Sequence, residues 1–196
     1  MSLFDPKELV KAKVKSRSGA VVVHGKTHAV ISTANQKVAD TMFMPQPDDT
    51  ISFMSKGDWS THDLLFFYLN LTGPAQVFFT TWSISEFAIR QLYSYVDSGL
   101  ITKLSGLFDY RNGIHKPSEL QFLKQIASDV QPSKCHAKVV VILNELWGIS
   151  IVTSGNFTRN PRIEAGTVYT ARHVAEFHKA WILDELNNTN ALEKDR

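Results

Sequence analysis

The stretch CHAKVVVIL, residues 135–143, places a histidine and a lysine two positions apart and then continues as an unbroken run of aliphatic residues. A short apolar run of this kind predicts a strand that is buried on both faces of a sheet. Because side chains alternate along a strand, His136 and Lys138 would share one face with Val140 and Ile142. We therefore expect two polar groups to project from one end of a buried strand.

A second strand follows closely and brings further polar groups to the same place. Residues 144–148 predict a turn, and the run ISIVT, residues 149–153, can return antiparallel to the first strand. The segment SGNFTRNPRIEAG, residues 154–166, would then lie beside the histidine and the lysine. The predicted pocket contains five functional side chains: His136, Lys138, Ser154, Asn156 and Glu164.

These residue types suit the cleavage of a phosphodiester. A neutral imidazole can attack phosphorus as a nucleophile, and a protonated one can donate to the leaving oxygen. Lys138, Asn156 and Ser154 offer donors for the charge that spreads over the nonbridging oxygens. Glu164 could accept from the second ring nitrogen of the histidine and so fix its tautomer. This chemistry predicts no metal ion and no cofactor.

The rest of the chain predicts an α/β fold with a mixed β-sheet sandwiched between helices on both faces. Strands alternate with helices, and three late strands come in succession. Helices are expected at residues 60–71, 85–99, 117–127 and 172–186, and strands at 76–82, 101–108, 136–143, 148–154 and 165–170. The first 70 residues are harder to interpret: they predict a helix from Asp5 to about Lys15, strands at 19–25 and 28–34, and a loop at 44–50.

Composition restricts the class of protein. With 43% hydrophobic residues the chain can form a sizeable core, so we expect a single domain over residues 1–188 and a frayed tail over 189–196. The net charge of +2 permits an anionic partner without demanding one. A single cysteine, Cys135, indicates a reducing compartment. No apolar run approaches the roughly 20 residues that span a bilayer, so a cytoplasmic protein is expected.

The segments HAKVVVIL and VTSGNFTRNPRIEAG resemble the His-x-Lys and Ser-x-Asn signature of the phospholipase D superfamily, in particular its small bacterial nucleases with one motif per chain. The resemblance implies that His136 is the nucleophile, that Lys138 and Asn156 bind the phosphate, that Ser154 is an assisting donor and that Glu164 orients the imidazole. The sequence departs from that pattern at Leu143, where the family has an aspartate, and at Thr153, where it has a glycine.

The resemblance also implies two such histidines in one active site, and this chain has one convincing copy. We expect a homodimer in which two His136 side chains face each other across a two-fold axis. The alternative is that His24-Gly25-Lys26, a degenerate second copy, supplies the other half.

The function predicted in this way is a metal-independent phosphodiesterase, a nuclease that cleaves DNA through a covalent phosphohistidine. Two alternatives stay open: a phospholipase D-type enzyme acting on lipid, and a catalytically weak relative that binds nucleic acid. Arg159 and Arg162 could bind a flanking phosphate, and Trp82 could stack on a base. Three questions stay open at this point: whether the substrate is DNA or RNA, whether it is single-stranded or double-stranded, and whether Leu143 weakens the activity.

Overall fold

The computed structural model of the chain describes residues 25–31, 37–111 and 117–188. The helix predicted from Asp5, most of the strand predicted at 19–25 and the tail at 189–196 lie outside this range. Within it, the strands are β1 Thr27–Ile31, β2 Thr50–Ser55, β3 Ala75–Thr81, β4 Ile101–Asp109, β5 Asp129–Ser133, β6 Val139–Leu143, β7 Gly148–Thr153 and β8 Glu164–Tyr169. The helices are α2 Val38–Thr41, α3 Thr61–Thr72, α4 Glu86–Asp97, α6 Pro117–Ile126 and α7 Arg172–Asn187.

The described strands form one mixed sheet of eight in the order β1-β2-β8-β7-β6-β3-β4-β5. The strands β3, β4 and β5 run parallel, whereas β6 is antiparallel to β3, and β7 and β8 continue antiparallel. On the far side, β2 pairs antiparallel with β8 and parallel with β1. The sequence did not predict β2 or β5. The strand β5 is polar and contains Pro132, which is tolerated because β5 lies at an edge of the sheet.

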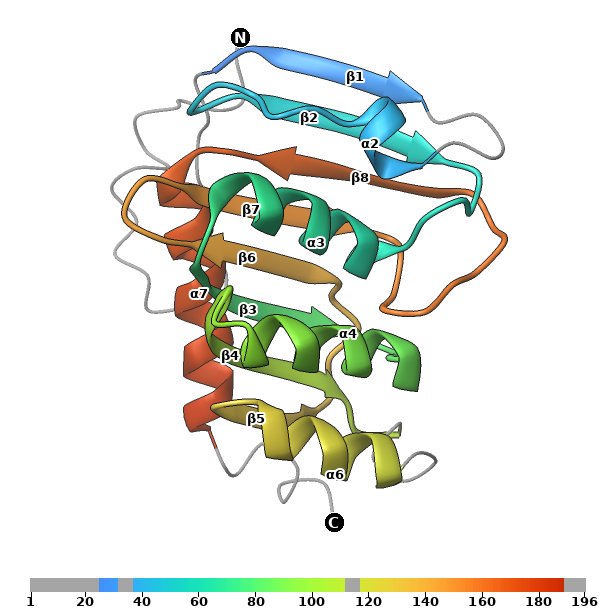
Figure 1. Cartoon of the computed structure of the whole chain (residues 1–196), viewed down its shortest axis with the longest axis vertical. Helices are drawn as coiled ribbons and strands as arrows, with labels where there is room; N and C mark the ends of the chain where they lie inside the picture. The colour runs from blue at the N-terminus through green and yellow to red at the C-terminus, as the bar shows by residue number, and fades with distance from the viewer. Residues whose placement is uncertain (1–24, 32–36, 112–116, 189–196) are drawn as a thin grey trace, which may run out of the picture.

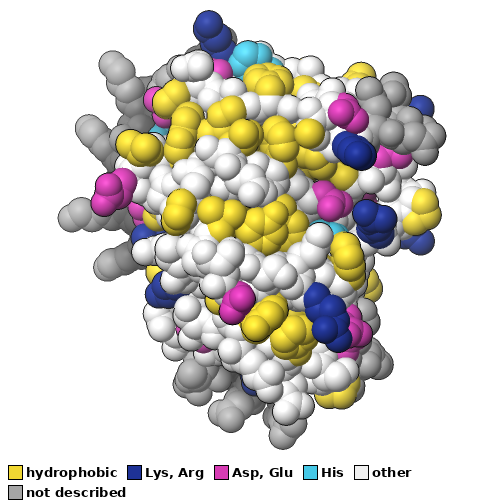
Figure 2. All heavy atoms as spheres, viewed as in Figure 1, with side chains coloured by type: hydrophobic (Ala, Val, Ile, Leu, Met, Phe, Trp, Pro, Cys, Tyr) yellow, Lys and Arg dark blue, Asp and Glu magenta, His cyan; other side chains and the backbone are white. Residues whose placement is uncertain are grey.

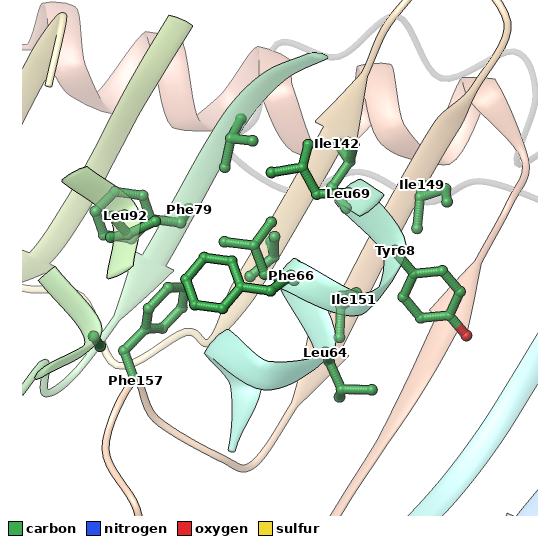
Figure 3. Packing of buried hydrophobic residues seen from close by; sticks show 14 of the residues in the cluster. Leu64, Phe66, Tyr68, Leu69, Phe79, Leu92, Ile142, Ile149, Ile151 and Phe157 are labelled. Carbon is green, nitrogen blue, oxygen red and sulfur yellow. The ribbon is translucent and has the colours of Figure 1, made fainter. Parts of the chain in front are cut away.

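Helices cover both faces of the sheet, which confirms the predicted fold class. Helices α3, α4 and α6 lie on one face and α7 crosses the other (Figure 1). The strand β6 shows why its sequence is apolar throughout: Val140 and Ile142 pack on the α3 side, while Val139, Val141 and Leu143 pack against the α7 side. The core on the α3 side is built from large side chains of α3, α4 and the central strands (Figure 3).

Local signals fix where α3 begins and ends. The backbone N–H of Ser60 donates to the Asp63 carboxylate at 2.8 Å, which satisfies a donor that the helix itself cannot pair. Gly73 ends the helix with φ of 77° and donates to the Leu69 carbonyl at 3.0 Å, a conformation that favours glycine. In the described part of the chain, no helix combines the length and the apolar character needed to cross a membrane.

Strand direction brings several connections to one edge of the sheet, which we call the His136 edge. The carboxyl ends of β2, β3, β4, β5 and β7 lie there, together with the amino ends of β6 and β8. Lys and Arg side chains lie along the corresponding right-hand margin of the molecule in Figure 2, beside some acidic ones. The connections that carry the predicted site residues, 134–138 and 154–163, therefore leave the sheet at the same edge.

Candidate active site

His136 and Lys138 lie in the connection just before β6, since the strand begins at Val139 and not at His136 as predicted. Hydrogen bonds to both neighbouring strands hold this connection in place. The Thr80 hydroxyl of β3 donates to the Ala137 carbonyl at 3.1 Å and accepts from the Val139 N–H at 3.1 Å. On the other side, the Thr153 N–H donates to the Lys138 carbonyl at 3.1 Å. The polar pair is thus fixed to the sheet although it stands outside the strand.

Lys138 provides a cation in direct contact with an exposed imidazole. Its Nζ lies 3.2 Å from each ring nitrogen of His136 and donates to the His136 carbonyl at 2.9 Å. Lys138 is only 9% exposed, whereas His136 is exposed. Burial lowers the pKa of Lys138, and the negative charge of Glu164 opposes that shift. A weakly solvated ammonium is a strong partner for phosphate oxygens, because little water competes for its protons.

Ser154 and Glu164 bond to each other, an interaction that the sequence did not predict. The Ser154 hydroxyl donates to the Glu164 carboxylate and accepts from the Ala165 N–H at 3.1 Å. Among the described residues, Glu164 accepts this bond and none from His136. The role of Glu164 in orienting the imidazole therefore stays a prediction. In the same range, acidic, histidine and cysteine side chains form no group of three that could hold a metal ion.

Asn156 is held by the end of β3 with its amide nitrogen left over. Its Oδ1 accepts from the Ser83 N–H at 3.3 Å and from the Thr81 hydroxyl at 3.4 Å. The next residue, Phe157, is fully buried and pairs with Ile84 in an isolated bridge. The amide nitrogen has no acceptor among the described residues, so its protons are available to a phosphate oxygen.

The predicted substrate residues fall into two groups. Trp82 is 36% exposed and its ring centre lies 6.1 Å from that of His136, so it borders the site. Arg159 instead lies over the Phe87 ring of α4, with its guanidinium carbon 5.9 Å from the ring centre. Arg162 is exposed and only its backbone makes a described contact, a bond from its N–H to the Asn160 carbonyl at 2.8 Å. Among the described contacts of Trp82, Arg159 and Arg162, only that of Trp82 reaches His136.

Arg111 is a candidate that the sequence reasoning missed. It follows β4, and its Nε donates to the Asp109 carboxylate at 2.7 Å while its guanidinium lies 5.7 Å from the centre of the Trp82 ring. Asp109 is 2% exposed, so the ion pair fixes the guanidinium firmly. The signal was present: Asp109 and Arg111 directly follow a strand predicted at 101–108, and polar residues after parallel strands gather at one edge.

Leu143 lies at the end of β6 farthest from Lys138. Five residues of strand separate the two positions by roughly 16 Å. Leu143 is 7% exposed and packs against the α7 side of the sheet. The next side chain, Asn144, holds the turn by donating to the Thr72 carbonyl at 3.0 Å and accepting from the Trp147 N–H at 2.8 Å. The departure at position 143 therefore affects packing at the opposite edge and removes no group from the pocket.

Of the degenerate copy at residues 24–26, Lys26 lies away from the site. His24 is outside the described residues, but Lys26 directly precedes β1, and its N–H donates to the Asp49 carboxylate at 2.9 Å. The pairing of β1 with β2 places the start of β1 at the edge opposite His136. The length of a strand thus separates Lys26 from the pocket, so Lys26 cannot act as a second lysine of the site.

No model of a known protein family matches the chain, and no curated protein matches it. Solved structures of other proteins, however, superpose on it. A phospholipase D family member, Nuc from Salmonella typhimurium, superposes with a TM-score of 0.50 and 15% identity over 63% of this chain and 86% of Nuc. A polyphosphate kinase from Porphyromonas gingivalis superposes with a TM-score of 0.54 and 17% identity over 69% of this chain, which spans 26% of the kinase. The chain therefore shares its fold with this phospholipase D family member and with part of the polyphosphate kinase.

Proposed function

We propose that this chain is a metal-independent phosphodiesterase that cleaves DNA through a covalent phosphohistidine at His136. The observation that carries the proposal is the direct contact between an exposed imidazole and the poorly solvated Lys138 ammonium, at 3.2 Å. The Asn156 amide nitrogen, which has no acceptor among the described residues, belongs to the same edge of the sheet. The two structural neighbours, a phospholipase D family member and a polyphosphate kinase, support chemistry at phosphorus.

The reaction proceeds in two displacements. A neutral ring nitrogen of His136 attacks phosphorus, the nitrogen–phosphorus bond forms and the bond to the leaving oxygen breaks. The leaving oxygen takes its proton from a second, protonated imidazole. That imidazole, now neutral, removes a proton from water, which attacks the phosphohistidine and releases His136. Lys138 and Asn156 bind the nonbridging oxygens through both steps.

The second imidazole comes from His136 of a second copy of the chain. The described part of one chain brings no other histidine to the Lys138 contact, and the start of β1 lies at the opposite edge. An isologous dimer brings the same patch of both subunits together, so one exposed imidazole per chain is enough for a pair. The exposure of His136 at the sheet edge supports such an arrangement.

The test is incubation of the purified protein in EDTA with labelled single-stranded DNA, double-stranded DNA, RNA and phosphatidylcholine. We expect cleavage of DNA in EDTA and an acid-labile phosphoryl adduct that His136→Ala abolishes. His173→Ala, which changes an exposed histidine at the start of α7 just after β8, is the matched control and should keep activity. Strict dependence on magnesium, or unchanged turnover by His136→Ala, would refute the proposal; cleavage of the lipid alone would replace DNA as the substrate.

A further inference from the structure

A cavity of about 410 Å³ opens beside His136 on the face of the sheet that α7 crosses. It is lined by Leu107, Ser133, Lys134, Cys135, His136, Ala137, Trp181 and Glu185. The floor comes from β4 and from the connection that carries His136, and the wall comes from the carboxyl-terminal half of α7. Its volume lies in the range of sites that hold small organic ligands. Of the residues that line this cavity, the phosphodiester chemistry described above uses only His136.

The wall of the cavity has an aromatic ring that is fixed in place. The Trp181 indole donates to Nδ1 of His178 at 3.0 Å, and the side chain is partly buried against the apolar cluster under α7. Burial lowers the pKa of His178, which favours the neutral ring that can accept this bond. The polar end of the indole is therefore satisfied, and Trp181 presents ring surface to the cavity.

Glu185 adds a carboxylate acceptor that has no hydrogen-bond partner among the described residues. It is half-buried on the next turn of α7, and no donor in the described ranges reaches its carboxylate. Burial raises the pKa of the neighbouring Cys135 thiol, and the charge of Glu185 acts in the same direction, as expected for groups that face one space. A carboxylate of this kind accepts from the exocyclic amino group of a base, cytosine above all.

We propose that this cavity binds the nucleobase next to the scissile phosphate, with the ring against Trp181 and its amino group donating to Glu185. The proposal rests on the function proposed above and gives it a substrate class. A base enters a cavity between a helix and the sheet only after it leaves its stack, so the enzyme acts on single-stranded or locally opened DNA. Stacking on an aromatic ring contributes affinity without strict sequence preference, and Glu185 adds a preference for bases with an amino group.

The kinetic test compares normal strands with strands in which the nucleotides flanking the cleaved bond lack bases. Glu185→Gln and Trp181→Leu should each raise KM for single-stranded DNA about tenfold and leave kcat/KM on the abasic strand unchanged. Asp184→Asn, an exposed carboxylate on the same helix, is the control and should change neither. Equal kcat/KM on both strands for the wild type, or a loss of the same size on the abasic strand for Glu185→Gln, would overturn the subsite.

A second readout needs no catalysis. Cys135 is the sole cysteine of the chain and lines the cavity, so its modification by methyl methanethiosulfonate reports occupancy. Deoxycytidine monophosphate should slow this reaction as it saturates the site, whereas deoxyribose 5-phosphate should not, and Glu185→Gln should weaken the protection. Equal rates with both compounds would contradict the subsite even if DNA is cleaved. Protection in a protein that cleaves nothing would refute the proposed function and retain the subsite.

Discussion

The two ends of β6 are made from one continuous sequence segment, yet they serve opposite purposes. At the His136 edge, Lys138 is held by backbone bonds and its side chain meets an exposed imidazole. At the other edge, Leu143 is buried and Asn144 uses its side chain to hold the turn. A cavity of about 650 Å³ also opens there, with Leu143, Asn144 and Arg172 in its lining, but the Arg172 guanidinium donates to the Asn144 and Glu145 carbonyls at 2.6 and 2.9 Å. At the His136 edge the exposed imidazole of His136 can meet a ligand, whereas at the other edge the side chains of Asn144 and Arg172 are used by the fold.

The largest expected effect is on catalysis at the His136 edge. Lys138→Gln removes the ammonium beside the imidazole, and loss of one such donor to the transition state lowers kcat/KM by about a hundredfold to a thousandfold. Steady-state cleavage of single-stranded DNA measures it. Lys179→Gln on α7 is the control, because that lysine pairs with Glu176 at 3.2 Å and does not line the cavity beside His136. Activity within twofold of the wild type for Lys138→Gln would remove Lys138 from the mechanism.

A substitution at the opposite edge should lower the stability of the protein and leave its catalytic activity unchanged. Leu143→Ala deletes a side chain that is 7% exposed, so the free energy of unfolding should fall by about 2 to 5 kcal/mol. Urea denaturation gives this value, and kcat/KM at a temperature where the variant is folded should match the wild type. Leu143→Asp should be less stable still and should gain no activity. A gain in turnover from Leu143→Asp would show that the two edges are coupled.

The pH dependence of kcat/KM tests whether the Glu164 carboxylate acts on the Lys138 ammonium. Burial lowers the pKa of Lys138 and the charge of Glu164 raises it. Glu164→Gln removes the raising charge, so Lys138 loses its proton at a lower pH and the alkaline limb of kcat/KM moves to lower pH. A profile of kcat/KM against pH measures the shift, with Glu176→Gln as control. An alkaline limb that stays in place or moves upward would contradict the assignment of that limb to Lys138.

The smallest effect concerns Arg111. Its guanidinium lies 5.7 Å from the centre of the Trp82 ring and pairs with Asp109, and a lysine would keep the charge but lose the planar fork. Arg111→Lys should raise KM for DNA by roughly twofold to fivefold with kcat unchanged. Arg90→Lys on α4, whose Nη2 lies 2.6 Å from the Glu86 carboxylate, is the matched control. An equal change in both variants would exclude a specific role for Arg111 at the site.

The sequence predicted most of the fold because strands β3, β4, β6, β7 and β8 have clear apolar patterns bounded by turn residues. It missed β5, where a polar segment with Pro132 becomes a strand only because β4 offers it an edge. For the site, the approach of segments 134–138 and 154–166 followed from the antiparallel return of β7. The bond between Ser154 and Glu164 and the position of Arg111 depend on side-chain geometry between elements, which no local pattern specifies.

The central claim is that two His136 side chains, one from each subunit, act in one site. Dimers assembled from wild-type and His136→Ala chains in varying proportion test it most directly, because only pairs of wild-type chains would hold both imidazoles. Activity should then fall with the square of the wild-type fraction, to about one quarter at an equal mixture. A linear fall, to about one half, would show that each chain works alone and would contradict the account.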